Sequence, residues 1–196
     1  MAFIQTIDDD QATGEVAEPY DADRARMGYV TNYTRVFAHR PAVYRAWRQL
    51  VGEISGAMDT RRYELVTLAA ARRLRSSYCM LAHGSVLADK FLGPERVRDV
   101  AVDHRGAGLD ELDVAVMDLA EKIVADATSV TREDVERLRE LGLSDEDIVD
   151  VVLAATARCF FSKTLDALGT EPDPAYKGVE PELREALVVG RPIAAG

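Results

Sequence analysis

Apolar residues recur at intervals of three and four along most of this chain, and residues that cap or end helices bound each such stretch. This spacing puts apolar side chains on one face of an α-helix, whereas a half-buried strand needs strict alternation. Stretches of this kind follow Pro41, Asp59, Ser76 and Asp110. The pattern therefore predicts an all-α protein.

Three long helices are predicted in the first half, after a short one that Pro19 opens toward Met27. The first of the three begins at Pro41, ends before Gly56 and has a stripe expected to face the core, made of Val43, Trp47, Leu50, Val51 and Ile54. The second begins at a cap formed by Asp59 or Thr60, and Ser76-Ser77 interrupts it. The third runs from about Tyr78 to Leu92, where Gly93-Pro94 closes it.

The second half continues with helices that have clear start signals. Asp110 can cap one helix, and Thr131 with Asp134 and Ser144 with Asp147 resemble capping boxes in which Asp replaces the usual Glu. The last long helix is predicted from about Asp145 to Leu168, with Gly169 as its terminator. The residues of this helix expected to face inward are Ile148, Val151, Val152, Ala155, Cys159 and Phe160.

The length of 196 residues, 47% of them hydrophobic, indicates one main domain with a sizeable core. Residues 1–19 lack helical periodicity over most of their length and are predicted to form an N-terminal arm. Residues 20–175 form the predicted helical domain. Residues 176–196 are predicted to be a C-terminal tail, which continues a segment rich in proline and either wraps over the surface or reaches a neighbouring subunit.

The charge balance excludes several function classes. The chain has 34 acidic residues against 24 Lys and Arg, a net charge of −10, which argues against nucleic acid and anionic membranes as partners. We find neither a signal peptide nor an apolar stretch long enough to cross a membrane, so a cytoplasmic location is expected. Cys79 and Cys159 are the only cysteines, which excludes a disulfide scaffold and multi-cysteine zinc sites.

Cys79 and His83 lie four residues apart in the predicted helix that follows Ser76-Ser77. This spacing puts both side chains on one helix face, within reach of a direct or water-bridged hydrogen bond. If Ser76 or Ser77 caps the helix, Cys79 falls in its first turn, where backbone amides and the helix dipole favour a thiolate. A thiolate can attack the O–O bond of a peroxide, and the oxidised product is a sulfenic acid.

Glu64 is the only acidic residue between Asp59 and Asp89, and an apolar stretch follows it. A single straight helix would place Glu64 about 22 Å from Cys79, so a shared site requires a break near Arg75-Ser76 or a second subunit. In that case the carboxylate would orient the His83 ring, stabilise its charged form and relay protons. Both features also have a non-catalytic interpretation. Glu64 can simply form a salt bridge with Arg61 or Arg72. Cys79 and His83 can be a buried thiol and a half-exposed ring that do not act together. Cys159 is interpreted as a small core residue.

Glu64, Cys79 and His83, the last two within the segment SSYCMLAHG, resemble the motif of the alkylhydroperoxidase D-like and carboxymuconolactone decarboxylase superfamily. That motif is a Glu followed by Cys-x-x-Cys-x-x-x-His. The resemblance is closest to the peroxidase-related branch. The segments GYVTNYTRVFAHRPAVYRAW and LDALG, the latter followed by TEPDP, support it, so that most of residues 20–175 is covered.

The resemblance implies an AhpD-like helical bundle that forms a dimer, trimer or hexamer, and catalytic roles for Glu64, Cys79 and His83. Ser76 stands where the family has its first cysteine, so any peroxidase activity would use Cys79 alone, and an external thiol would reduce it. Two auxiliary roles are open for Ser76, namely proton transfer between His83 and water, and capping of the helix. No metal or bound cofactor is required.

The leading hypothesis is a thiol-dependent, peroxidase-like antioxidant enzyme that acts on a small hydroperoxide, with Cys79 as nucleophile, His83 as base and Glu64 as the group that orients it. Two alternatives remain. One is a cofactor-free decarboxylase or lactone-processing enzyme acting on an organic acid, in which His83 and Glu64 move protons. The other is a helical oligomer that has lost catalysis.

Overall fold

The computed structural model describes residues 2–196, in which all regular structure is helical and no strand is present. The α-helices are α1 (Ala17–Met27), α2 (Asn32–Phe37), α3 (Pro41–Ala57), α4 (Thr60–Leu74), α5 (Ser77–Leu87), α6 (Pro94–Asp103), α7 (Glu111–Asp126), α8 (Arg132–Glu140), α9 (Asp145–Ala167) and α10 (Pro181–Leu187). Short helical turns are η1 (Gly14–Val16), η2 (Ala88–Leu92), η3 (Ala127–Ser129) and η4 (Pro174–Gly178). The predicted all-α fold class is confirmed.

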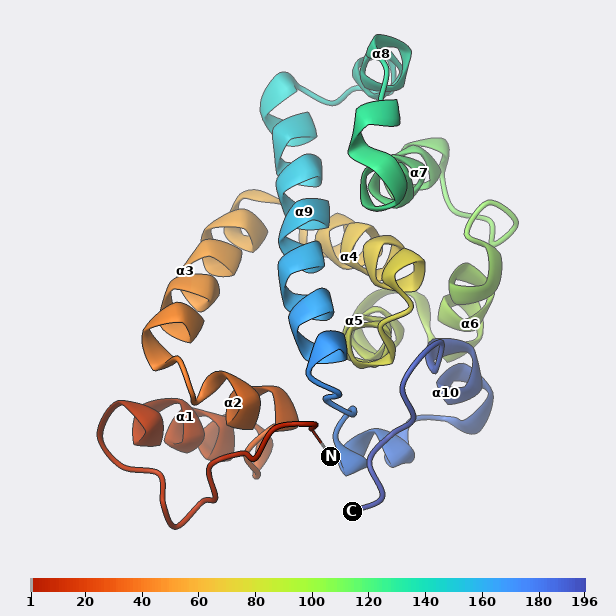
Figure 1. Cartoon of the computed structure of the whole chain (residues 1–196). Coiled ribbons are helices and arrows are strands. Elements are labelled where there is room, and N and C mark those ends of the chain that lie inside the picture. Colours follow the sequence, from red (N-terminus) through yellow and green to blue (C-terminus); the bar gives the residue numbers. More distant parts are fainter. Residues whose placement is uncertain (1) are drawn as a thin grey trace.

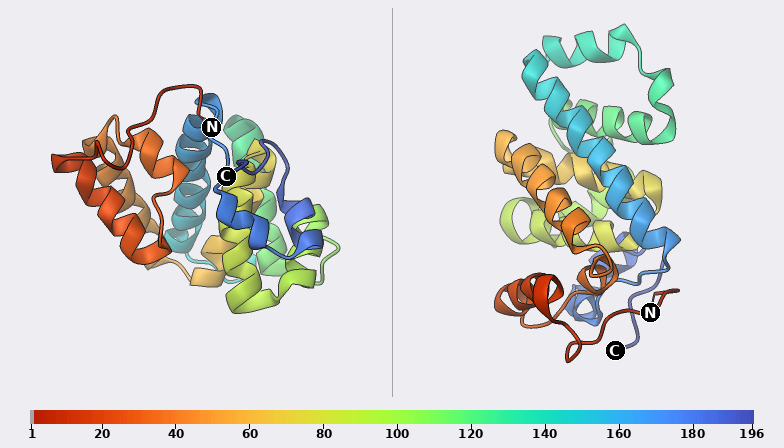
Figure 2. Two further views of the ribbon diagram at one scale, coloured as in Figure 1. Left: turned by 90° about the horizontal axis from the view of Figure 1, so that it is seen from below. Right: turned by 60° about the vertical axis from the view of Figure 1, so that its left-hand side comes forward.

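Helix α4 forms the centre of the molecule and packs against α5, α7 and α9. Figure 1 shows α9 running along the middle, with α1 to α3 on one side and α6 and α10 on the other. The two chain ends lie at the same end of the molecule, opposite α8, as the right-hand view of Figure 2 shows. Because α4 has neighbours on several sides, every residue from Tyr63 to Ala71 is buried.

The predicted helix starts agree closely with the structure. Asp59 and Asp110 each accept a hydrogen bond from the backbone N–H three residues on, at the beginning of α4 and α7. Thr131 and Ser144 form the expected capping boxes at the beginning of α8 and α9, with Asp134 and Asp147 in place of Glu. Capping depends on residues only three positions apart, which is why the sequence alone predicts it well.

The sequence did not predict helices α2, α6 and α10. It also did not predict that the helical geometry changes after α5. Pro94 and Pro181 were interpreted as helix terminator and tail signal, but each occupies the first turn of a new helix, where proline loses no intrahelical hydrogen bond. The helix predicted to continue to Leu92 changes at Ala88 into a π-helical turn.

The expected inward faces of α3 and α9 are partly wrong. Val43 and Leu50 on α3, and Val152 and Phe160 on α9, are exposed, and Cys159 is only half-buried. Val43, Leu50 and Phe160 line an apolar groove between these two helices, together with the buried Trp47. An apolar residue next to a core-facing stripe can equally line a surface groove, and helical spacing does not distinguish the two.

The C-terminal segment packs into the core and holds the start of α5. Leu187 on α10 is fully buried against Gly84 of α5, where a Cβ atom would approach the leucine Cδ2 to 2.7 Å. Farther along, the Gly190 N–H donates a 2.8 Å hydrogen bond to Ser77 Oγ. The predicted tail is therefore part of the scaffold beneath α5.

No helix in residues 2–196 is both long enough and apolar enough to span a membrane.

We predict that Leu187→Ala lowers the free energy of unfolding by about 3 kcal/mol, because it leaves a cavity against α5. Leu153→Ala on α9 is the matched control, because Leu153 is 41% exposed and its truncation should change stability by less than about 0.5 kcal/mol. Urea denaturation followed by circular dichroism measures both. Equal effects of the two substitutions would show that α10 is not part of the cooperative core.

Candidate active site

A sharp turn between α4 and α5 brings the predicted site residues together within one chain. Arg75 adopts a left-handed conformation with φ of 57°, and the backbone N–H groups of Arg75 and Ser76 bond to carbonyls of the last turn of α4. Helix α5 then packs back along α4. Of the two arrangements the sequence left open, the structure has the break near Arg75-Ser76, and no second subunit is needed.

Glu64 on α4 and His83 on α5 form the central contact of this site. His83 Nδ1 lies 2.6 Å from Glu64 Oε2, and both side chains are largely buried. The alternative partners of Glu64 are bonded elsewhere, since Arg61 pairs with Asp113 and Arg72 pairs with Glu121. The carboxylate is therefore placed to orient the His83 ring, as expected.

The charge state of His83 differs from the expectation. Burial and the nearby positive charge of Arg158 lower the pKa of His83 below its usual value, and the hydrogen bond and charge of Glu64 only partly oppose them. A neutral ring that donates Nδ1–H to Glu64 leaves Nε2 as a proton acceptor. Glu64 therefore contacts a neutral ring, because burial and Arg158 outweigh the stabilisation that Glu64 gives to the charged form of His83.

Cys79 lies in the first turn of α5, as predicted, but its closest polar partners belong to α9. Ser162 Oγ donates a hydrogen bond of 3.1 Å to Cys79 Sγ, and Arg158 Nη1 donates one of 3.6 Å. Cys79 is 1% exposed and is part of the hydrophobic core, but its sulfur has these two polar partners. Among the described residues no direct hydrogen bond joins Cys79 to His83, although both line the same pocket.

Arg158 is the residue that the sequence analysis missed. Its guanidinium is buried and also donates a 3.3 Å hydrogen bond to Tyr63 Oη, and within residues 2–196 no carboxylate forms an ion pair with it. Burial lowers the pKa of Arg158, but Cys79 and Tyr63 outweigh this effect and raise it. A buried cation without a carboxylate partner among residues 2–196 favours an anion beside it. Its two ionisable hydrogen-bond partners are the Tyr63 phenol and the Cys79 thiol, and thiols in general ionise more readily than phenols.

A signal for Arg158 and Ser162 was present in the sequence. The buried face of α9 includes Ile148, Val151, Ala155, Arg158, Ser162 and Leu165, at intervals of three and four. The predicted inward face of this helix contained only apolar residues. It therefore included Cys159 and Phe160 in place of Arg158 and Ser162. A charged residue in register with an apolar stripe is a sign of a buried functional group.

Ser76 and Cys159 lie outside the pocket. Ser76 occupies the position before α5 but makes no capping hydrogen bond with its side chain. Its buried hydroxyl makes no hydrogen bond of acceptable geometry within residues 2–196. Ser76 still lies close enough to Asp166 on α9 to oppose, together with Arg191, the rise that burial causes in the pKa of that carboxyl. Both cysteines are free thiols. The structure thus brings Glu64, Cys79 and His83 together but does not place Ser76 or Cys159 with them.

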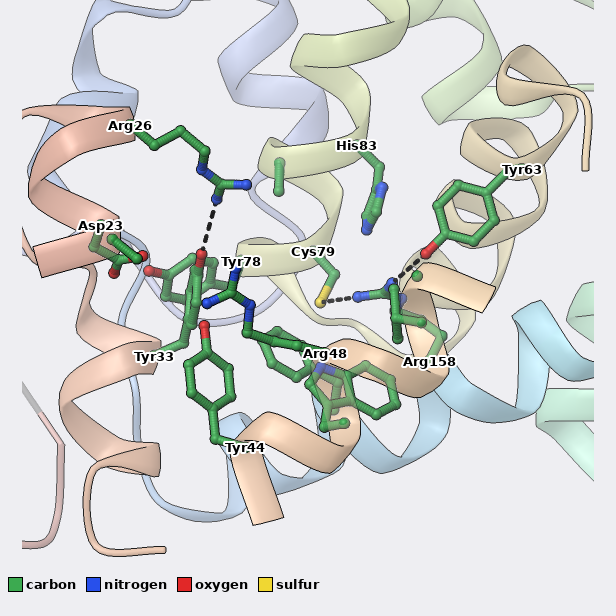
Figure 3. Close-up of a pocket in the computed structure, with 16 residues that line it drawn as sticks. Asp23, Arg26, Tyr33, Tyr44, Arg48, Tyr63, Tyr78, Cys79, His83 and Arg158 are labelled. Atoms are coloured by element: carbon green, nitrogen blue, oxygen red, sulfur yellow. Dashed lines mark hydrogen bonds between the residues drawn. The ribbon is translucent and has the colours of Figure 1, made fainter. Parts of the chain in front are cut away.

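The pocket in front of Cys79 has a volume of about 350 Å³. Figure 3 shows Cys79 and His83 extending from the same helix, with Arg158 and Tyr63 beside them and Tyr33, Tyr44, Arg26 and Arg48 around the remaining wall. In residues 2–196, no three His, Cys, Asp or Glu side chains are grouped in a way that could hold a metal ion.

Comparison with solved structures identifies the fold. An AhpD-core, uncharacterized peroxidase-related protein from Ralstonia eutropha JMP134 superimposes with a TM-score of 0.81 at 22% identity, covering 89% of this chain and 94% of the other. A peroxidase-related protein from Silicibacter sp. TM1040 gives 0.79 at 20% identity, covering 88% and 94%.

A third solved structure is a cysteine variant of the debrominase Bmp8 in complex with 2,3,4-tribromopyrrole. It gives a TM-score of 0.75 at 12% identity and covers 93% of this chain and 96% of the other. The sequence matches no model of a known protein family and no curated protein. The resemblance expected from the sequence motif is thus confirmed at the level of the fold.

We predict that Glu64→Gln lowers the pKa of His83 further and that Arg158→Gln raises it, because the first removes a negative charge and the second a positive charge beside the ring. The titration of the His83 ring protons, followed by NMR, measures both shifts. Glu121→Gln, which removes a remote carboxylate paired with Arg72, should leave the midpoint unchanged. Shifts of the same sign in the two site variants would contradict this electrostatic description.

Proposed function

The chain has the all-α fold of the alkylhydroperoxidase AhpD core, and on this fold we propose that it is a thiol-dependent peroxidase with a single reactive cysteine, Cys79. The observation that carries the proposal is the buried Arg158 guanidinium, which has no carboxylate partner within residues 2–196 and donates a hydrogen bond to the Cys79 sulfur. A thiolate at this position would supply the missing negative charge. The motif Glu64, Cys79 and His83 supports the same conclusion from the sequence.

The first half of the reaction oxidises Cys79. Neutral His83 accepts the thiol proton at Nε2, and Arg158 and Ser162 stabilise the thiolate. The sulfur attacks the terminal oxygen of a hydroperoxide, so that an S–O bond forms as the O–O bond breaks. The leaving alkoxide takes the proton from His83 and departs as an alcohol, while Cys79 becomes a sulfenic acid.

The second half returns Cys79 to its reduced form. An external thiol attacks the sulfenic sulfur and releases water, which leaves a mixed disulfide with Cys79. A second external thiol then attacks this disulfide, so that Cys79 leaves as a thiol and the two external sulfurs become joined. Two thiols are thus oxidised for each peroxide reduced. Ser76 cannot resolve the sulfenic acid because it carries no sulfur.

We predict that peroxide converts Cys79 to a sulfenic acid that dimedone traps, with mass spectrometry as the readout. Arg158→Gln should slow this step by about tenfold or more at neutral pH, because it removes a charged hydrogen bond to the thiolate. It should slow alkylation of Cys79 by iodoacetamide to a similar extent, which tests thiolate formation separately from peroxide chemistry.

Cys159→Ser, one residue away on the same helix, is the control and should react at the wild-type rate. Circular dichroism checks that each variant is folded. Trapping at Cys159 rather than Cys79, or a folded Arg158→Gln variant as fast as wild type, would contradict the proposal. Turnover of an organic acid that survives Cys79→Ser but not His83→Ala would instead indicate the decarboxylase alternative.

We further predict that Ser76→Cys creates a peroxidase that a dithiol reductant supports. The substitution restores the second sulfur of the Cys-x-x-Cys pattern, so the introduced thiol can form a disulfide with Cys79, which dithiothreitol then reduces. Ser85→Cys is a control, since it adds a thiol to the same helix outside that pattern and replaces a hydroxyl that has no hydrogen-bond partner within residues 2–196. Steady-state peroxide consumption should increase only in the Ser76→Cys variant, and equal rates in the two variants would refute the assignment of this position.

A further inference from the structure

Aromatic side chains form a large part of the walls of the pocket at Cys79. Six aromatic residues from five helices line it, namely Tyr33, Tyr44, Trp47, Tyr63, Tyr78 and Phe161. Their rings contact one another, as in the T-shaped pair of Tyr33 and Tyr78 and the stacked pair of Trp47 and Phe161, with centroids 5.5 and 5.3 Å apart. Such packing restricts the rings and forms firm, flat walls, which match a flat apolar group better than a flexible chain.

Several of the tyrosine hydroxyls already have partners. Tyr78 Oη donates to Asp173, and Tyr44 Oη shares a 3.2 Å hydrogen bond with Thr34 Oγ1. Tyr63 Oη accepts from Arg158. The rings, rather than these hydroxyls, are therefore the groups that most of the wall offers to a ligand.

Two exposed arginines on the pocket wall lack acidic partners. Arg26 on α1 donates a 3.3 Å hydrogen bond to Tyr33 Oη, and the guanidinium carbon of Arg48 on α3 lies 5.9 Å from the centre of the Tyr44 ring. Figure 3 shows both guanidinium groups near the hydroxyl ends of these tyrosines. Within residues 2–196 neither arginine forms an ion pair with a carboxylate, although the chain has a net charge of −10.

Neighbouring arginines on the same two helices do have acidic partners. Arg24 on α1 pairs with Asp9 and Asp21, and Arg45 on α3 approaches Glu15 and Glu18. In an acidic chain, arginines left without a carboxylate partner beside a cavity favour an anion from solution.

The pocket wall also includes one carboxylate, that of Asp23. It is buried, and its Oδ2 accepts hydrogen bonds from the backbone N–H and the hydroxyl of Thr31, at 3.0 and 2.6 Å. These donors partly compensate its charge. Arg26, Arg48 and Arg158 thus outnumber it on the pocket wall.

We infer that the pocket binds an aromatic carboxylate, with the ring between the aromatic walls and the carboxylate at Arg48 and Arg26. If the chain is also a peroxidase, as proposed above, its preferred hydroperoxide carries an aryl ring with an acidic group. This consequence rests on the proposed function. Arg26 and Arg48 are exposed, whereas Cys79 is buried. The acid group would therefore remain at the solvent side while the peroxide reaches the sulfur.

The test uses benzoate as the probe and Trp47 as the reporter, because Trp47 lines the pocket and is the only tryptophan in the chain. We expect benzoate to change the tryptophan fluorescence of the full-length protein and to bind about tenfold more tightly than uncharged benzamide. It should also bind more tightly than cyclohexanecarboxylate, which has the charge but not the flat ring. Arg48→Gln should weaken benzoate binding about tenfold, as expected for the loss of one charged hydrogen bond.

Arg45→Gln is the matched control, since Arg45 is exposed on the same helix but lies outside this pocket, and it should bind benzoate like the wild type. Absence of benzoate binding, equal binding of benzamide, or equal losses in Arg48→Gln and Arg45→Gln would overturn the inference. Equal binding of cyclohexanecarboxylate would overturn its aromatic part.

Cys79→Ser separates the inference from the proposed function, because this variant should still bind benzoate while losing peroxide chemistry. If benzoate binds but peroxide forms no sulfenic acid at Cys79, the peroxidase proposal is wrong and the binding site is supported. If sulfenic acid forms at Cys79 but benzoate does not bind, the binding site is wrong and the peroxidase proposal is supported. If both hold, 4-carboxycumene hydroperoxide should oxidise Cys79 faster than cumene hydroperoxide, and equal rates would overturn the substrate preference.

Discussion

A buried guanidinium without a carboxylate partner is the constraint on which the site depends. Arg158 lies beside Cys79 and lowers the pKa of His83, so one positive charge acts on both groups. Burial strengthens this effect because little water screens the charge. It favours the neutral form of the imidazole, and in the proposed reaction it would stabilise the Cys79 thiolate. A neutral imidazole is the state that the proposed base requires.

Three helices must pack correctly to create this arrangement. Helix α4 supplies Glu64, α5 supplies Cys79 and His83, and α9 supplies Arg158. The turn at Arg75 sets α5 against α4, and the C-terminal segment holds the start of α5 through Gly190 and Ser77. Segments far from the motif in sequence therefore determine the positions of its side chains. The stability of this packing and the geometry of the site are coupled.

How far the sequence predicts a feature depends on how local its physical cause is. The capping boxes at Thr131 and Ser144 were predicted because a cap involves residues three positions apart. The short helices that begin at Pro94 and Pro181 were missed, since a proline signals either the end of one helix or the start of another. The exposure of Phe160 was also missed, because burial depends on which helices lie opposite.

The sequence by itself determined the helical class, most helix starts and the spacing that places Cys79 and His83 on one helix face. Only the tertiary structure decided that Glu64 meets His83 within one chain, that Ser76 lies outside the pocket, and that Arg158 reaches the sulfur. The physical reason is that propensity, capping and periodicity act over a few residues. The electrostatics of a buried site, by contrast, depend on which side chains the packing of distant segments brings together and shields from water.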